Sequence, residues 1–148
     1  MMKHSLMKLA PLFVGFAAMA ACGGDSTTAP SALVGSYTAI EFVTTGSSGQ
    51  TNQLLAGSTL SITLASNHST SGHLHMAASG SSPAFDADLA GTWTQTGNSV
   101  TFSQAADTFV RNTTFAAVAG SGSLWDLVGD GTFSGTAVHV TLRQQASL

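Results

Sequence analysis

Two histidines and two aspartates stand at spacings that suit a divalent cation. His73 and His75 are separated by one residue, and so are Asp86 and Asp88. Residues two apart on a β-strand share one face, so each pair would point in one direction. Imidazole nitrogens and carboxylate oxygens are common ligands of zinc-like ions. These four residues are therefore a candidate metal site. The alternative, which we favour, is a set of surface His–Asp contacts contributing roughly 0–1 kcal/mol.

The two pairs meet only if a hairpin joins their strands. A turn about Gly80-Ser81 sets Met76 against Phe85 on the apolar face, and it places the polar pairs opposite each other on the other face. The predicted polar partners are His75 with Asp86 and His73 with Asp88.

A single cysteine follows a segment with the pattern of an export signal. The first eight residues carry two lysines and no acid, and residues 9–21 form an uncharged apolar run that ends in small residues. This run is shorter than the roughly 20 residues of a membrane-spanning helix, and the pattern is typical of a secretory signal. A lone cysteine in an exported chain has no internal disulfide partner, so its thiol needs another role.

The segment Met19-Ala20-Ala21-Cys22-Gly23 resembles the lipobox of bacterial lipoproteins, with Met19 where leucine is usual. The resemblance implies that the Cys22 thiol receives a diacylglycerol group, that the signal is cut just before it, and that the new amino terminus takes a fatty acyl chain such as palmitate. In enterobacterial lipoproteins an Asp directly after the cysteine favours inner-membrane retention. Gly23 stands there, which implies the outer membrane. The alternative is ordinary cleavage after Ala20, which would release a soluble protein with a free thiol.

Short alternating runs of apolar and hydroxyl side chains make up the chain from Leu33 onward. Clusters of Gly, Ser and Asn separate these runs, and the pattern counts about eight strands joined by short hairpins. We therefore predict an all-β domain, an antiparallel up-and-down barrel, because closure removes exposed edges. The predicted divisions are a helical signal peptide (1–21), a lipidated cysteine with a flexible tether (22–32) and the barrel (33–148).

Charged residues are scarce and the balance after Cys22 is acidic. Lys3 and Lys8 precede it, so of four Lys and Arg residues only Arg111 and Arg143 remain against seven acids, a net charge of about −5 (2 − 7). Two cations are too few to neutralise a nucleic acid backbone, so that class of partner is excluded. No serine lies in a nucleophile-elbow pattern and no glycine-rich loop would cradle a phosphate, so we expect no enzyme and no cofactor.

A Gly-x-aromatic pattern recurs along the chain, first as Gly35-x-Tyr37 and again as Gly91-x-Trp93. In an eight-strand meander this resembles the lipocalin and lipocalin-like families. There, a Gly-x-Trp on the first strand closes one barrel end, often under an arginine from the last strand. The resemblance implies that Gly35, Tyr37, Trp93 and Arg143 close the barrel here. Tyr37 departs from the usual tryptophan, and ordinary core packing is the alternative for these aromatic residues.

The lipocalin resemblance implies a barrel interior that holds a small apolar molecule, although apolar side chains alone could fill it. We therefore expect a monomeric, non-enzymatic lipoprotein of the cell envelope whose partners are the membrane and a small apolar ligand or envelope component. The alternative is a structural or protein-interaction module with a filled barrel. The side chains that could fill the interior are Leu60, Ile62, Leu64, Leu74, Met76, Phe85, Leu89, Trp93, Val100, Phe102, Val138, Val140 and Leu142.

Overall fold

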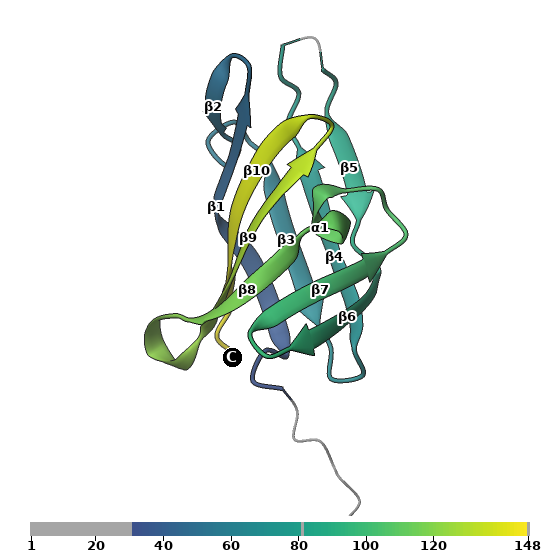
Figure 1. The fold of residues 1–148 in the computed structure, drawn as a ribbon, viewed down its shortest axis with the longest axis vertical. Coiled ribbons are helices and arrows are strands. Elements are labelled where there is room, and N and C mark those ends of the chain that lie inside the picture. The colour runs from purple at the N-terminus through teal and green to yellow at the C-terminus, as the bar shows by residue number, and fades with distance from the viewer. Residues whose placement is uncertain (1–30, 81, 148) are drawn as a thin grey trace, which may run out of the picture.

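Ten β-strands and two very short helical segments make up the residues that the computed structural model describes, 31–80 and 82–147 (Figure 1). The predicted signal segment and most of the tether, including Cys22, lie outside this part of the chain. The strands are β1 (Gly35–Gly46), β2 (Gly49–Asn52), β3 (Thr59–Leu64), β4 (Ser69–Met76), β5 (Phe85–Asp88), β6 (Gly91–Thr96), β7 (Ser99–Gln104), β8 (Thr114–Ala119), β9 (Trp125–Phe133) and β10 (Thr136–Gln144). The helical segments are α1 (Phe109–Asn112) and a 3-10 turn (Ser121–Ser123).

The sheet closes on itself because β10 pairs with β1. From β10 the hydrogen-bonded order runs through β9, β8, β7, β6, β4 and β3 to β1, and every pairing is antiparallel. Strands β5 and β6 pair with successive parts of β4 and act as one interrupted strand, while β2 only extends the β1 hairpin. The predicted eight-stranded antiparallel barrel is confirmed.

Alternation along each strand sends apolar side chains inward and hydroxyl side chains to solvent. In β7, Val100 and Phe102 are buried, whereas Ser99, Thr101 and Ser103 are exposed. The rings of Phe102 and Phe115 meet edge to face, 5.3 Å between centroids. The largest fully buried side chains are Trp93, Tyr37, Phe42 and Phe115. Their burial supplies the main free energy of folding, about 1.5–3 kcal/mol for each large apolar side chain.

The barrel end near Ser31 is closed by a small set of hydrogen bonds. The Tyr37 hydroxyl donates to the Leu33 carbonyl oxygen at 2.8 Å, and the Trp93 indole nitrogen donates to the Ala65 carbonyl oxygen at 3.0 Å. The buried Gln144 amide donates to two carbonyl oxygens of the entering chain, at 3.0 and 3.1 Å, and accepts from the Trp125 amide at 3.0 Å. These bonds satisfy polar groups that would otherwise be costly to bury.

Two elements differ from the sequence-based expectation. Residues 44–52 form one of the Gly-, Ser- and Asn-containing clusters that read as turns in the sequence, but the end of β1 and all of β2 form a projecting hairpin there, with a tight turn between Gly46 and Gly49. Helix α1 follows β7 and buries Phe109 and Val110. Among residues 31–80 and 82–147, no helix is long and apolar enough to span a membrane.

Candidate functional site: a cavity at one end of the barrel

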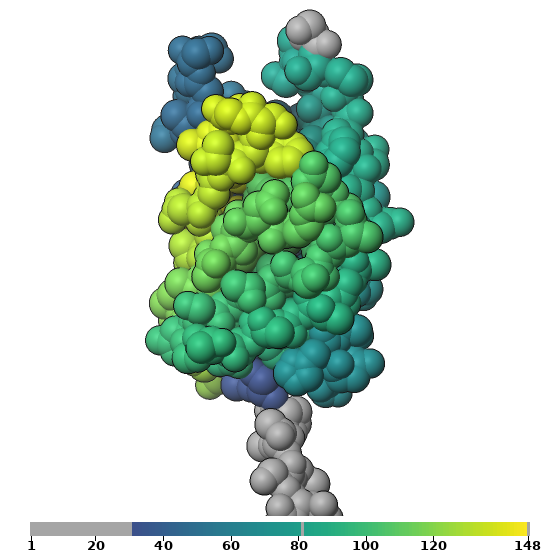
Figure 2. Space-filling model, turned by 45° about the vertical axis from the view of Figure 1, so that its right-hand side comes forward, coloured from purple at the N-terminus to yellow at the C-terminus, as the bar shows by residue number. Residues whose placement is uncertain are grey.

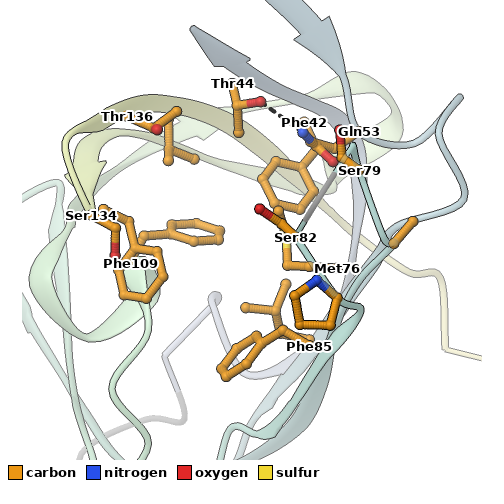
Figure 3. A pocket seen from close by; sticks show the side chains of 15 residues that line it. Phe42, Thr44, Gln53, Met76, Ser79, Ser82, Phe85, Phe109, Ser134 and Thr136 are labelled. Carbon is orange, nitrogen blue, oxygen red and sulfur yellow. Dashed lines mark hydrogen bonds between the residues drawn. The ribbon is translucent and has the colours of Figure 1, made fainter. Parts of the chain in front are cut away.

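A cavity of about 320 Å³ lies at the barrel end opposite the point where the described chain begins (Figures 1 and 3). The β1–β2 hairpin and the β4–β5 connection project on either side of this end, with the β9–β10 turn between them (Figure 2). The cavity is lined by Phe42, Thr44, Gln53, Leu74, Met76, Ala77, Ser79, Ser82, Pro83, Phe85, Phe109, Phe133, Ser134, Thr136 and Val138.

Four phenylalanines from separate parts of the chain belong to the apolar wall. Phe42 comes from β1, Phe109 from α1, Phe133 from the end of β9 and Phe85 from the start of β5. The Phe42 and Phe109 rings lie 5.3 Å apart, tilted by 44°. Helix α1 therefore contributes to the site by placing Phe109 against the β1 wall. A concave, mostly apolar surface that includes aromatic side chains is the usual form of a small-molecule site.

A short chain of hydrogen bonds lies along one side of the cavity. The Ala77 amide donates to the Ser58 hydroxyl oxygen at 2.9 Å, and that hydroxyl donates to Gln53 Oε1 at 3.0 Å. Gln53 Nε2 then donates to Thr44 Oγ1 at 2.7 Å (Figure 3). Gln53 is buried, and these bonds fix its amide in one orientation.

The interior beyond the cavity is filled by side chains. Leu60, Ile62 and Leu64 of β3, with Val140 and Leu142 of β10, are all nearly inaccessible to solvent. The barrel is thus packed toward the Ser31 end and hollow toward the other. The sequence left open whether the barrel interior is filled by side chains or hollow. The structure has a filled interior at the Ser31 end and a hollow at the opposite end.

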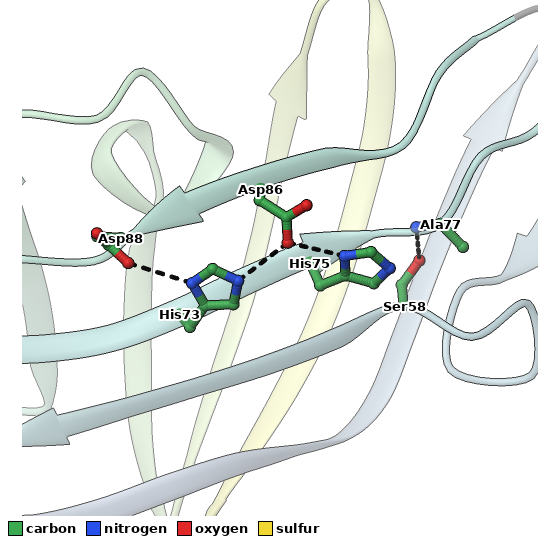
Figure 4. A network of polar contacts seen from close by, with 6 residues as sticks. All are labelled: Ser58, His73, His75, Ala77, Asp86 and Asp88. Atoms are coloured by element: carbon green, nitrogen blue, oxygen red, sulfur yellow. Dashed lines mark hydrogen bonds and ion pairs between the residues drawn. The ribbon is translucent and has the colours of Figure 1, made fainter.

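The His and Asp residues singled out in the sequence come together on the outer surface (Figure 4). The predicted register is confirmed, because β4 and β5 pair His73 with Asp88 and His75 with Asp86. Asp86 Oδ1 lies 3.0 Å from His73 Nε2 and 2.8 Å from His75 Nδ1, and Asp88 Oδ1 lies 3.2 Å from His73 Nδ1. The hydrogen bonds to Asp86 and Asp88 raise the pKa of His73, and those from His75 and His73 lower the pKa of Asp86.

In this arrangement the ring nitrogens face the carboxylate oxygens and do not converge on a common empty point. Within the described part of the chain, no group of three His, Cys, Asp or Glu side chains has a geometry that could hold a metal ion. Metal binding by these four residues stays a prediction, and the surface ion pairs are the arrangement present.

A second acidic–histidine cluster, which sequence reasoning missed, lies on β9, β10 and β1. His139 Nδ1 lies 2.7 Å from Asp130 Oδ1, and Nε2 lies 3.5 Å from Glu41 Oε2. The hydrogen bond to Asp130 raises the pKa of His139. The sequence did contain a signal for this cluster. Counting the hairpin register outward from a turn at Ser134-Gly135 places Asp130 opposite His139, as the same count about Gly80-Ser81 places β5 opposite β4.

The four residues expected to close the barrel have different surroundings in the structure. Tyr37 and Trp93 are buried at the closed end, and Gly35 lies against the Gln144 side chain. Arg143 instead forms a two-pronged ion pair with Asp126, at 2.9 and 2.8 Å, which lowers the pKa of that carboxyl group. Arg143 alternates with the buried residues of β10, so it faces outward, and the next residue supplies the polar group at the barrel end.

Asp107 and Arg111, four residues apart in the sequence, form an ion pair. It joins the segment before α1 to the last turn of that helix and lies outside the cavity lining.

Comparison with models of protein families, with curated proteins and with solved structures found no match to this chain.

Proposed function

We propose that this protein is a bacterial lipoprotein of lipocalin-like type, anchored to a cell-envelope membrane through Cys22, whose barrel binds a small apolar ligand. The supporting observation is the cavity of about 320 Å³ with four phenylalanines in its wall.

The size of the cavity sets the size of the ligand. One water molecule occupies about 30 Å³ in the liquid, and a covalently bonded carbon atom takes up less, so the cavity has room for on the order of ten to twenty non-hydrogen atoms. Each buried methylene group gains about 0.8 kcal/mol, which must exceed the cost of losing translational freedom. A ligand of this size is expected to bind in the micromolar range or weaker.

The position of the cavity suits a tethered protein. The described chain begins at Ser31, so the Ser31 end of the barrel is the end nearer in sequence to Cys22 (Figure 1). The cavity opens at the opposite end. An anchor at Cys22 would leave the cavity accessible from the side facing away from the membrane. The alternative is a structural or interaction module, and the packed interior at the Ser31 end of the barrel supports it. The experiment below distinguishes the ligand-binding function from this alternative.

The first test is native mass spectrometry of protein extracted from the membrane of its own cells. We expect a mass that corresponds to cleavage before Cys22 plus acyl chains, together with a retained small molecule that gentle activation releases. A mature chain that starts elsewhere and carries no lipid would contradict the anchor. An acylated chain with no retained or added ligand would favour the interaction module.

The second test fills the cavity from its rim. Thr136→Trp places an indole in the cavity, and binding of the neutral apolar fluorophore N-phenyl-1-naphthylamine is expected to weaken by at least about tenfold. The matched control is Ala137→Trp, because Ala137 is the next residue of β10, is exposed and lies outside the lining. Circular dichroism and thermal unfolding show whether both variants fold. Equal fluorophore binding by folded Thr136→Trp would show that the probe binds elsewhere.

A further inference from the structure

The hydrogen-bond chain beside the cavity has a fixed direction. The Ala77 amide can only donate, so the Ser58 oxygen accepts from it and the Ser58 hydrogen is directed to Gln53. Gln53 therefore presents its oxygen to Ser58 and its Nε2 group to Thr44. The backbone holds the same residue on both sides, since the Gln53 amide donates to the Phe42 carbonyl oxygen at 2.8 Å and the Ser58 amide donates to the Gln53 carbonyl oxygen at 2.9 Å.

This direction leaves donors at the cavity. Thr44 Oγ1 accepts from Gln53, so its own hydrogen is available to an oxygen atom in the cavity. Gln53 Nε2 carries a second hydrogen beside it. Both side chains belong to the lining (Figure 3). A buried amide that is oriented from behind by Ser58 is suited to recognise a hydrogen-bond acceptor, and it needs no charge to do so.

The lining contains no ionisable side chain. Its fifteen residues are aromatic, aliphatic, hydroxyl-bearing or amide-bearing, with Met76 and Pro83. In the described residues the two arginines are engaged elsewhere, Arg111 with Asp107 and Arg143 with Asp126. A carboxylate or ammonium group drawn into this cavity would lose its hydration without gaining a counter-ion, which costs several kcal/mol.

We propose that the ligand is a neutral amphiphile, with an apolar body among the phenylalanine rings and an uncharged oxygen acceptor, such as a hydroxyl or ester carbonyl, bound by Thr44 and Gln53. The assignment rests on the proposed function and specifies its ligand class. It excludes free fatty acids and long-chain amines as preferred ligands, although both offer the same apolar body.

The test compares decanol, decanoate and decylammonium as competitors of N-phenyl-1-naphthylamine on the full barrel near neutral pH. These compounds share one chain and differ in the charge of the head group. We expect decanol to displace the fluorophore at a concentration at least about tenfold lower than either charged analogue. If decanoate or decylammonium competes as well as decanol, the ligand class is wrong while the cavity function stands. If the parent protein does not bind the fluorophore at all, the proposed function itself fails.

Two variants separate the parts of the inference. Thr44→Val keeps the shape but removes one donor and also the acceptor of Gln53 Nε2. Decanol affinity is expected to fall by about fivefold to tenfold. Naphthalene has no oxygen acceptor, so its affinity should be unchanged, and a general disturbance of the cavity would reduce both. An unchanged decanol-to-naphthalene ratio would overturn the role of Thr44.

Thr136→Lys adds a cation to the lining. It is expected to strengthen decanoate binding by at least about tenfold, because the carboxylate gains a partner. Ala137→Lys is the control, since it adds the same charge on the exposed face of β10. Equal decanoate affinity in the two folded variants would show that the absence of charge in the lining does not determine the ligand class.

Discussion

The Tyr37 side chain carries a buried hydroxyl group that is hydrogen-bonded within the barrel domain. It is fully inaccessible to solvent, and its hydroxyl group donates to the Leu33 carbonyl oxygen. This bond joins β1 to the first buried residue of the barrel domain. Burial raises the pKa of the Tyr37 hydroxyl above its usual range, and the negative charge of Asp126 raises it further.

The raised pKa predicts how alkali unfolds the protein. An unfolded tyrosine ionises near about pH 10, whereas folded Tyr37 stays protonated above that value. The unfolded state therefore binds fewer protons in this range, so the stability present below about pH 10 is lost as the pH rises toward the folded pKa.

Tyr37 is the only tyrosine in the sequence, so its phenolate absorbance reports this one group. We expect that signal to appear together with the loss of the far-ultraviolet circular dichroism of the barrel. Tyr37→Phe should show no such signal and should be about 1 kcal/mol less stable near neutral pH. Phenolate that forms at ordinary pH while the barrel remains intact would contradict this prediction.

The residues of the candidate site were only partly predictable. Register arithmetic identified the partners on β4 and β5, because alternation and a short hairpin are local properties. Thr44 begins a segment, residues 44–52, that reads as a polar turn, and nothing local shows that Gln53, which follows it, returns to the barrel. Their role depends on Ser58 and on the Ala77 amide, which belong to other segments and become neighbours only after folding.

At the scale of elements, the close pairing of β4 with β3 requires a glycine, Gly72. Gly72 lies where β4 exchanges one partner strand for the next, and its carbonyl oxygen accepts from the Leu89 amide at 2.9 Å. A Cβ atom at Gly72 would lie 2.2 Å from the Ser61 carbonyl oxygen and 2.7 Å from Ile62 Cα, both backbone atoms of β3. The two strands would have to separate to admit even a methyl group.

Gly72→Ala is accordingly expected to destabilise the protein by about 1–3 kcal/mol or more, because backbone atoms cannot move aside as a side chain can. The control is Gly46→Ala at the end of β1, where a Cβ atom would meet nothing within 4 Å, and its effect should stay within about 0.5 kcal/mol. Urea unfolding of both variants measures the difference. Similar stabilities would show that β3 and β4 are less closely joined than their geometry indicates.

Elements whose apolar and polar residues alternate with a clear period were predicted from the sequence, and elements without such a period were not. Strands such as β3 and β7 alternate clearly, so both their existence and their inward faces followed from the sequence. Helix α1 spans four residues, too few for a helical period to show. It nevertheless places Phe109 in the cavity wall, so the residues of that wall could not be predicted from periodicity, although the barrel could.

At the scale of the whole molecule, the anchor and the binding domain are expected to be separable. The described domain begins its hydrogen bonding at Ser31 and its first strand at Gly35, well after Cys22. Cys22→Ala should therefore move the protein from the membrane fraction to the soluble fraction of the envelope, while thermal stability and fluorophore affinity of the purified barrel stay as in the parent.

Metabolic labelling with an alkyne-tagged palmitate gives an independent readout of the same variant. The parent should incorporate the label and Cys22→Ala should not. The matched control is Ser26→Ala, a similarly small change a few residues beyond the cysteine, which should leave labelling unchanged. Label that persists in Cys22→Ala, or a variant that stays membrane-bound, would show that another feature holds the protein to the membrane.

The pairing of β1 with β10 joins the earliest strand to the latest, from Tyr37 beside Gln144 to Thr45 beside Ala137. If the chain crosses a membrane amino end first, as the proposed export signal requires, β1 emerges long before its closing partner. The nascent domain then has two open strand edges until translocation is complete. We expect it to acquire its native structure only after release from the translocation channel, at the millisecond-to-second pace of folds dominated by distant contacts.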